Sequence, residues 1–252
     1  MSKSELVKAV TEPANKALTP LASSVGHTLQ DIWDLVFGGF GTYVDKKRAA
    51  RLKDLEDFRE SLTAKVSAIP EDSLCEPKLS VIGPALEASK FFFEEPQIRE
   101  MFARLIASSM NKELSSTVHP SFSAIIQQMS PLDAENLALF DRYTSFPVVE
   151  YQRKTRSEVG YITLFRNIFV SNPNRTDLLS QSQSISSLEH LGLLQADYEH
   201  YLVDAQRYGE FDRTSLYTAL QNALGPEYEL SIQNGLVTLT PLGQQFRSIC
   251  LD

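Results

Sequence analysis

The segment PQIREMFARLIASSMN, residues 96–111, decides the architecture of the chain. Its hydrophobic residues recur at spacings of three and four, so they fall on one side of a helix. A stripe this continuous has to face other apolar surfaces, and Pro96 stands where the first turn of a helix accepts proline. We therefore expect a helix in the centre of a helical core. The stripe consists of Ile98, Met101, Phe102, Leu105, Ile106 and Met110.

Two segments upstream show the same periodicity. Residues 43–70 place apolar residues three or four positions apart with charged residues between them, which predicts a long amphipathic helix that ends before Pro70. Residues 80–94 predict a compact apolar helix with Pro84 in its first turn.

Two short helices are predicted downstream, within residues 118–143. Each has a proline in its first turn, Pro120 or Pro131, and a polar residue at the capping position before it, His119 or Ser130. The chain up to about residue 144 is therefore expected to be helical.

The composition changes after this point. Residues 146–152 and 160–170 are rich in β-branched and aromatic side chains, which predicts a pair of strands. Residues 178–195 predict a helix that runs into Gly192, and residues 196–203 predict another strand.

The end of the chain carries two further markers. Asn234-Gly235 lies between two short apolar runs, which predicts a hairpin, and Pro241 predicts the start of a last helix. A helix, then strands, a hairpin and a terminal helix are typical of a winged-helix module, here with residues 204–227 as an insertion.

We expect an α+β fold that is predominantly α. A helical domain at residues 1–144 contains an amphipathic segment at 27–66 and a helical core at 69–144. A winged-helix-like α+β domain follows at residues 145–252. A length of 252 residues is compatible with two such modules.

Composition excludes several classes of protein. The net charge of −8 opposes general binding to nucleic acid, which is therefore not expected. The two cysteines, Cys75 and Cys250, are far apart and form no disulfide or zinc motif. No apolar run has the length of a signal peptide or a transmembrane helix, so we expect a cytoplasmic protein.

No residue pattern points to catalysis. The four histidines do not stand in the spacings of metal sites, and no phosphate-binding loop or nucleophile motif is present. His119 is the strongest candidate for acid-base chemistry, but its position as a cap on the helix whose first turn holds Pro120 explains it better. We therefore predict no catalytic, cofactor-binding or metal-binding residues and no cofactor.

The N-terminal part suggests a surface contact. An apolar, glycine-interrupted stretch at residues 27–40 precedes a strongly basic stretch at residues 45–53. Such a junction can rest on an anionic membrane or on a partner, and a core helix followed by a solvated helix is the competing interpretation. The candidate contact residues are Trp33, Phe37, Phe40, Lys46, Lys47, Arg48 and Arg51.

Charge also bears on the winged-helix-like half. Residues 186–230 contain eight acidic and two basic residues, a net charge of −6 where contacts with phosphate would be required. A contact with protein, or simple packing within the fold, is the better expectation there.

Four segments of this chain resemble the abortive infection alpha family of bacterial and phage-borne proteins. They are IPEDSLCEPKLSVIGPALEASKFF at 69–92, EEPQIREMFARLIASSMN at 94–111, VHPSFSAIIQQMSPLDA at 118–134 and LTPLGQQFRSIC at 239–250. The family core thus falls at residues 69–144. The positions that match the family pattern, without an assigned role, are Arg99, Glu100, Ser108, Ser109, His119, Pro120, Ser130, Pro131 and Asp133.

The resemblance implies defence against bacteriophage, in which an infected cell stops growing before progeny emerge. It implies no reaction. We expect a non-enzymatic effector or sensor that acts through a host or phage protein, through self-association, or through peripheral contact with the inner face of the membrane. The alternative is an adaptor or regulator whose C-terminal half binds protein or DNA.

Overall fold

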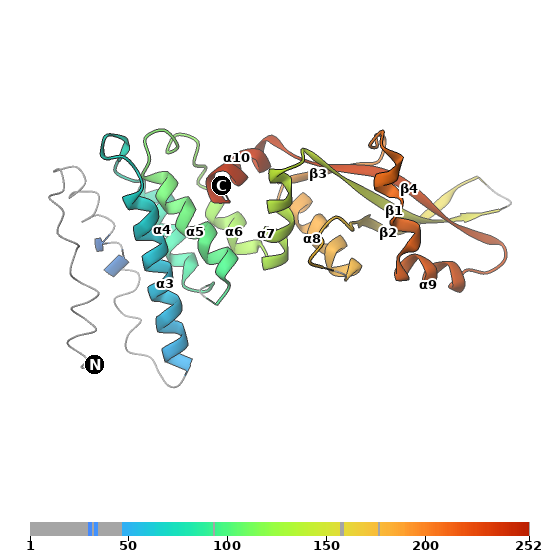
Figure 1. Cartoon of the computed structure of the whole chain (residues 1–252), viewed down its shortest axis with the longest axis horizontal. Coiled ribbons are helices and arrows are strands. Elements are labelled where there is room, and N and C mark those ends of the chain that lie inside the picture. The colour runs from blue at the N-terminus through green and yellow to red at the C-terminus, as the bar shows by residue number, and fades with distance from the viewer. Residues whose placement is uncertain are drawn as a thin grey trace.

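The structure is a computed structural model. It describes residues 30, 31, 33, 34, 47–92, 94–156, 159–175 and 177–251, with side chains from Lys53 onward in the first long helix. Figure 1 shows an elongated molecule, with a helical half at one end and a sheet half at the other.

The helical half is built around α5 (Pro96–Ser109), as expected from its apolar stripe. All six residues of that stripe are buried, with Ile98, Phe102 and Leu105 completely inaccessible. Helices α3 (Lys47–Ser67) and α4 (Leu79–Ser89) pack directly on α5. The shorter elements are η2 (Glu71–Ser73), α6 (Phe122–Gln128), α7 (Pro131–Ala138) and η3 (Leu139–Asp141).

The sheet half contains four antiparallel strands in the order β2-β1-β4-β3, curved into a half-barrel. The strands are β1 (Ser145–Thr155), β2 (Tyr161–Ile168), β3 (Leu194–Asp197) and β4 (Tyr228–Leu239). Helix α8 (Leu178–His190) connects β2 to β3. The segment between β3 and β4 forms η4 (Ala205–Tyr208), η5 (Phe211–Arg213) and α9 (Ser215–Ala223).

One hydrophobic core joins the two halves. The final helix, α10 (Pro241–Cys250), leaves β4 and packs on α5, so the C-terminus returns to the helical half (Figure 1). Phe122 of α6 and Phe246 of α10 meet edge to face, with ring centroids 5.2 Å apart. A smaller core on the other side of the sheet packs Val149 and Tyr151 against Phe211.

The α+β class is thus correct, but the winged-helix description is not confirmed, and the predicted hairpin at Asn234-Gly235 is wrong. Strand β4 runs unbroken through both residues, which pair with Val149 and Val148 of β1. Gly235 instead allows another segment to pass close to β4, because the backbone of Asp197 and the ring of Tyr198 lie directly against it.

Two boundaries also differ from the prediction. The strand expected at residues 196–203 ends at Asp197, whose carboxylate accepts hydrogen bonds from the backbone N–H groups of Glu199 and His200 and so turns the chain. Pro84 lies inside α4 and not in its first turn, because that helix already begins at Leu79.

Candidate functional site

Polar side chains gather on one face of the half-barrel. Along β1, Val149 and Tyr151 point into the smaller core, so Glu150 and Gln152 point to the opposite face. Both polar residues are buried, and Glu150 also lines an open hollow. The face opposite the smaller core is therefore apolar at Val148, which belongs to the main core, and polar from Glu150 to Gln152.

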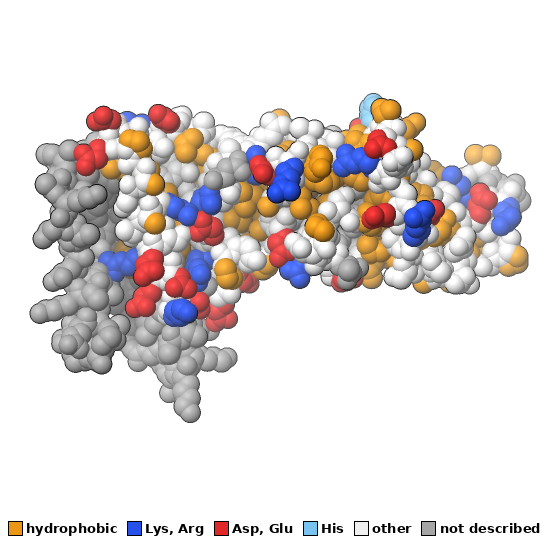
Figure 2. All heavy atoms as spheres, in the orientation of Figure 1, with side chains coloured by type: hydrophobic (Ala, Val, Ile, Leu, Met, Phe, Trp, Pro, Cys, Tyr) orange, Lys and Arg blue, Asp and Glu red, His pale blue; other side chains and the backbone are white. Residues whose placement is uncertain are grey.

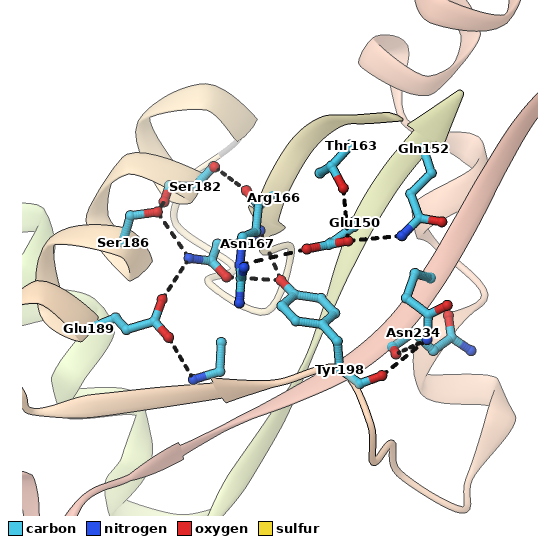
Figure 3. A network of polar contacts seen from close by, with 12 residues as sticks. Glu150, Gln152, Thr163, Arg166, Asn167, Ser182, Ser186, Glu189, Tyr198 and Asn234 are labelled. Carbon is cyan, nitrogen blue, oxygen red and sulfur yellow. Dashed lines mark hydrogen bonds and ion pairs between the residues drawn. The ribbon is translucent and has the colours of Figure 1, made fainter. Parts of the chain in front are cut away.

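Helix α8 fastens the two edge strands to each other. The Ser182 hydroxyl donates a 2.6 Å hydrogen bond to the backbone carbonyl of Arg166 on β2. The Glu189 carboxylate accepts a 3.2 Å hydrogen bond from the backbone N–H of Ala196 on β3 (Figure 3). One helix thus satisfies backbone groups on both open edges of the sheet.

Asn167 and Tyr198 form the centre of this junction. Asn167 has a left-handed backbone (φ 56°), which asparagine tolerates better than most residues. Its side-chain amide donates to Ser186 (3.0 Å) and to Glu189 (3.1 Å). The Tyr198 hydroxyl donates to the Asn167 side-chain oxygen (2.9 Å) and accepts from its backbone N–H (3.0 Å; Figure 3). Burial raises the pKa of Tyr198 well above its ordinary value, so the phenol stays protonated and can donate.

Glu150 is the most enclosed charge on the polar face, with its side chain 10% exposed. It accepts hydrogen bonds from Gln152 (2.9 Å) and Thr163 (3.2 Å), and Arg166 Nε lies 3.6 Å away. The Arg166 guanidinium also lies over the Tyr198 ring, 4.9 Å from its centroid. These partners explain how a carboxylate is accommodated at such low exposure.

An open hollow of about 620 Å³ lies beside this network. Its lining combines three carboxylates, Glu150, Asp197 and Glu199, with the single guanidinium of Arg166, a net charge of −2. Tyr161 of β2 also lines it. A hydrogen bond from His200, 2.7 Å long, is the main cause that lowers the pKa of Asp197, so this carboxylate stays charged at neutral pH.

The family-pattern residues on α5 hold helices together. Arg99 pairs with Asp54 (3.3 Å) and Asp57 (3.6 Å) of α3. Glu100 accepts from Ser61 (2.7 Å) and pairs with Lys65 (2.5 Å) of α3. The two positions thus join α5 to α3.

The hydroxyls at the end of α5 bind backbone carbonyls. Ser108 donates to Ile249 of α10 (3.3 Å), and Ser109 donates to Ile106 (2.6 Å). Cys250 is completely buried beside them, and burial raises the pKa of its thiol well above the ordinary value. A thiol in such a place is not a nucleophile.

His119 and Pro120 form a turn before α6. Helix α6 begins at Phe122, two residues after Pro120, so the prediction that Pro120 lies in its first turn is wrong. The exposed His119 ring accepts a 3.2 Å hydrogen bond from the Ser121 backbone N–H. The backbone carbonyl of His119 accepts a second one from the Phe122 N–H (3.0 Å). The ring therefore caps this turn, and the side chain of Phe122 is fully buried as expected.

Ser130, Pro131 and Asp133 form a capping box at the start of α7. The Ser130 hydroxyl accepts from Asp133 N–H (3.2 Å), and the Asp133 carboxylate accepts from Ser130 N–H (2.8 Å). Ser187 of α8 also donates to that carboxylate (3.3 Å), so the cap joins α7 to α8.

The candidate N-terminal contact residues are only partly described. Trp33 is 7% exposed and stacks on Phe58, with ring centroids 5.6 Å apart, so it is not presented on the surface. Phe37, Phe40 and Lys46 lie outside the described residues. Lys47, Arg48 and Arg51 belong to α3, of which only the backbone is described at these positions.

The hollow was not predicted from the sequence. The strand FPVVEYQ contained one clue, since Glu150 and Gln152 alternate with apolar residues where a fully buried strand would carry none. The sequence around Tyr198 and Arg166 gives no comparable indication of a site, because only the pairing of distant strands brings these two residues close to Glu150.

The described residues contain no group of three or more histidines, cysteines or carboxylates placed to hold a metal ion. Within the same residues, no helix combines the length and hydrophobicity needed to cross a bilayer.

No curated protein matches the chain, and no solved structure matches it. The family model of abortive infection alpha matches residues 50–250, which include both halves of the fold and the hollow. The chain therefore belongs to the abortive infection alpha family, whose description indicates a role of the abortive-infection type.

Proposed function

We propose that this chain is a non-enzymatic antiphage protein that acts during abortive infection by binding another protein through its polar hollow. The observation that carries the proposal is the construction of the hollow. Its lining side chains Glu150 and Tyr198 are held by hydrogen bonds from residues of β1 and β2, helix α8 binds the backbone of β2 and β3 beside them, and the hollow opens to solvent. A preorganised open surface of this kind is suited to recognition.

The contacts of the two serines at the end of α5 and of His200 also support binding over catalysis. Ser108 and Ser109 donate to backbone carbonyls and not to a base. His200 pairs with Asp197, but its ring is 74% exposed, and its described contacts include no serine or cysteine. Nucleophilic catalysis requires a base within hydrogen-bonding reach of the attacking atom.

An adaptor or regulator that binds protein or DNA through its C-terminal half, the alternative function, would use the same hollow. A net charge of −2 around the hollow favours a protein over DNA as its occupant, because phosphate groups would be repelled. Salt-dependent binding to duplex DNA would favour the DNA version of this alternative.

The test is a phage challenge of bacteria that carry the gene, with nearly every cell infected. We expect phage yield to fall while infected carrier cells fail to recover. Glu150→Gln, which keeps the shape of the side chain and removes its charge, should abolish this effect. Glu113→Gln, an exposed loop position away from the hollow, is the matched control and should keep it.

Melting temperatures of both variants show whether Glu150→Gln is folded. Unchanged phage yield with the wild-type chain across a broad phage panel would contradict the antiphage role. A folded Glu150→Gln variant that protects as well as the wild type would contradict the role of the hollow.

A further inference from the structure

We propose that the open edge of β2, over Tyr161–Phe165, docks an extended basic segment of a partner protein, which adds to the sheet as a fifth strand and places cationic side chains in the hollow. This inference deepens the proposed function, because it rests on the hollow being a protein-binding site.

The first observation is the position of β2 at the edge of the sheet. Its inner side pairs with β1, and Tyr161, Ile162 and Thr163 are in regular register with Lys154, Arg153 and Gln152. The register shifts between the pairs Gln152–Thr163 and Tyr151–Phe165, so the regular part of this edge ends at Thr163. The stretch from Tyr161 to Thr163 is regular enough to accept another strand.

The second observation is that α8 covers only part of this edge. Ser182 binds the carbonyl of Arg166, at the α8 end of β2. From Tyr161 to Phe165, no described residue outside the sheet forms a hydrogen bond with the backbone. The opposite edge is different, because β3 has only four residues and Glu189 binds its Ala196 N–H.

The third observation is the absence of the usual edge protection. Natural edge strands carry charged residues, proline or β-bulges, which prevent unwanted pairing. The sequence YITLF at residues 161–165 contains no charged residue and no proline, and its register with β1 shifts only after Thr163. Tyr161 is 60% exposed and Ile162 is 55% exposed, and Figure 2 shows hydrophobic side chains at the surface of the far end of the sheet half. An apolar edge left open in this way is suited to a partner strand.

The hollow determines the chemistry of that strand. Thr163 contacts Glu150, so this side of β2 faces the polar hollow, and Tyr161 lines the hollow as well. Side chains of an added strand alternate between the two faces of the sheet. One set would enter the hollow, where Asp197 and Glu199 favour lysine or arginine, and the other set would lie beside exposed Ile162 and favour apolar residues.

A second copy of this chain fits less well. Self-pairing of β2 would offer only the side chains of YITLF to the hollow, and none of these is basic. Charge complementarity therefore selects a partner whose strand alternates basic and β-branched residues.

The experiment measures binding of three fluorescent, acetylated decapeptides to the full chain by anisotropy. The first alternates lysine and valine, the second alternates glutamate and valine, and the third repeats the first with N-methyl groups on every second residue. N-methylation removes backbone donors from one edge and keeps the side chains. We expect the first peptide to bind at least about tenfold more tightly than either of the others.

Charge reversal in the chain separates local recognition from general attraction. Glu199→Lys should weaken binding of the lysine peptide by about fivefold, the range of a single exposed ion pair. Glu210→Lys changes the net charge equally at an exposed position that does not line the hollow, and should change binding little. Hydrogen exchange should show new protection of the amides of residues 161–165 with the first peptide.

Equal binding of the lysine and glutamate peptides, or full binding of the N-methylated peptide, would overturn the inference. So would protection that appears only outside β2. A dimer that protects residues 161–165 without any peptide would identify a second copy as the occupant and would also overturn it. If no peptide binds while Glu150→Gln still abolishes protection from phage, the docking mode is wrong and the proposed function stands.

Discussion

The ring of Tyr198 occupies the space into which a side chain at position 235 would project. A Cβ atom on Gly235 would lie 2.6 Å from Tyr198 Cδ1 and 2.6 Å from the backbone oxygen of Asp197. Both distances are below those that real Cβ atoms show, and one of the two atoms belongs to backbone that cannot easily move. The glycine therefore allows the segment after β3 to cross β4, and this crossing places Tyr198 beside the hollow.

Gly235→Ala should consequently destabilise the protein by about 1–3 kcal/mol, the usual range for overpacking. Gly83 is the control, because a Cβ there meets no atom within 4 Å in α4. Gly83→Ala should stabilise by about 0.5–1 kcal/mol, since alanine suits a helix better than glycine. Urea unfolding measures both changes, and equal effects of the two substitutions would contradict the crowding at Gly235.

The capping box at α7 gives a second prediction. Ser130→Ala should lower the free energy of unfolding by about 1 kcal/mol. Asp133→Ala should lower it more, because Asp133 is 3% exposed and also accepts from Ser187. The double variant should lose less than the sum of the two, because each side chain binds the backbone of the other. Loss of phage protection in Asp133→Ala with an unchanged melting temperature would contradict this purely structural role.

The third prediction concerns a buried amide cluster between α7 and α8. Asn136 is completely buried, donates to Gln181 (2.9 Å) and Ser184 (3.0 Å), and accepts from Asn172 (2.8 Å). Asn136→Ala leaves these groups without partners and should cost about 3 kcal/mol. Asn174→Ala, at an exposed position of the loop before α8, is the control and should change stability little. A loss below 1 kcal/mol for Asn136→Ala would show that the cluster relaxes easily.

How far the sequence predicts this fold depends on how local the decisive contacts are. The stripe on α5 and the cap that Ser130 provides for α7 each depend on residues within one helix, and both predictions are confirmed. Asn234-Gly235 has a strong local preference for a turn, but pairing with β1 along the whole of β4 overrides it. A preference of about 1 kcal/mol cannot compete with a complete ladder of hydrogen bonds.

The candidate site follows the same principle. Alternation along β1 indicates that Glu150 and Gln152 share a face, which a sequence can show. The approach of Tyr198 and Arg166 to Glu150 depends on β3 joining β4 and on α8 spanning the two edges. Arg166 is 16 positions and Tyr198 is 48 positions away from Glu150 in the sequence, and no local pattern specifies contacts over such separations.

The last prediction concerns pH and Glu100. Partial burial raises the pKa of this carboxyl, but hydrogen bonds from Lys65 and Ser61 and the charges of Lys65 and Arg104 outweigh it, and the pKa lies below its ordinary value of 4.5. A carboxylate with a lowered pKa stabilises the folded state above the unfolded value, and this contribution disappears as the pH falls through the folded value. Glu100→Gln should therefore be less stable than the wild type at about pH 7, and the gap should narrow below about pH 4.5.

Urea unfolding of both proteins across this pH range measures the gap. Glu87→Gln is the matched control, because Glu87 pairs with Lys90 at the end of α4 and its side chain is 59% exposed. Its difference from the wild type should stay small at every pH, as expected for a surface ion pair. A gap for Glu100→Gln that is equally large at about pH 3 and pH 7 would show that Glu100 stabilises the α3–α5 interface through packing and not through its charge.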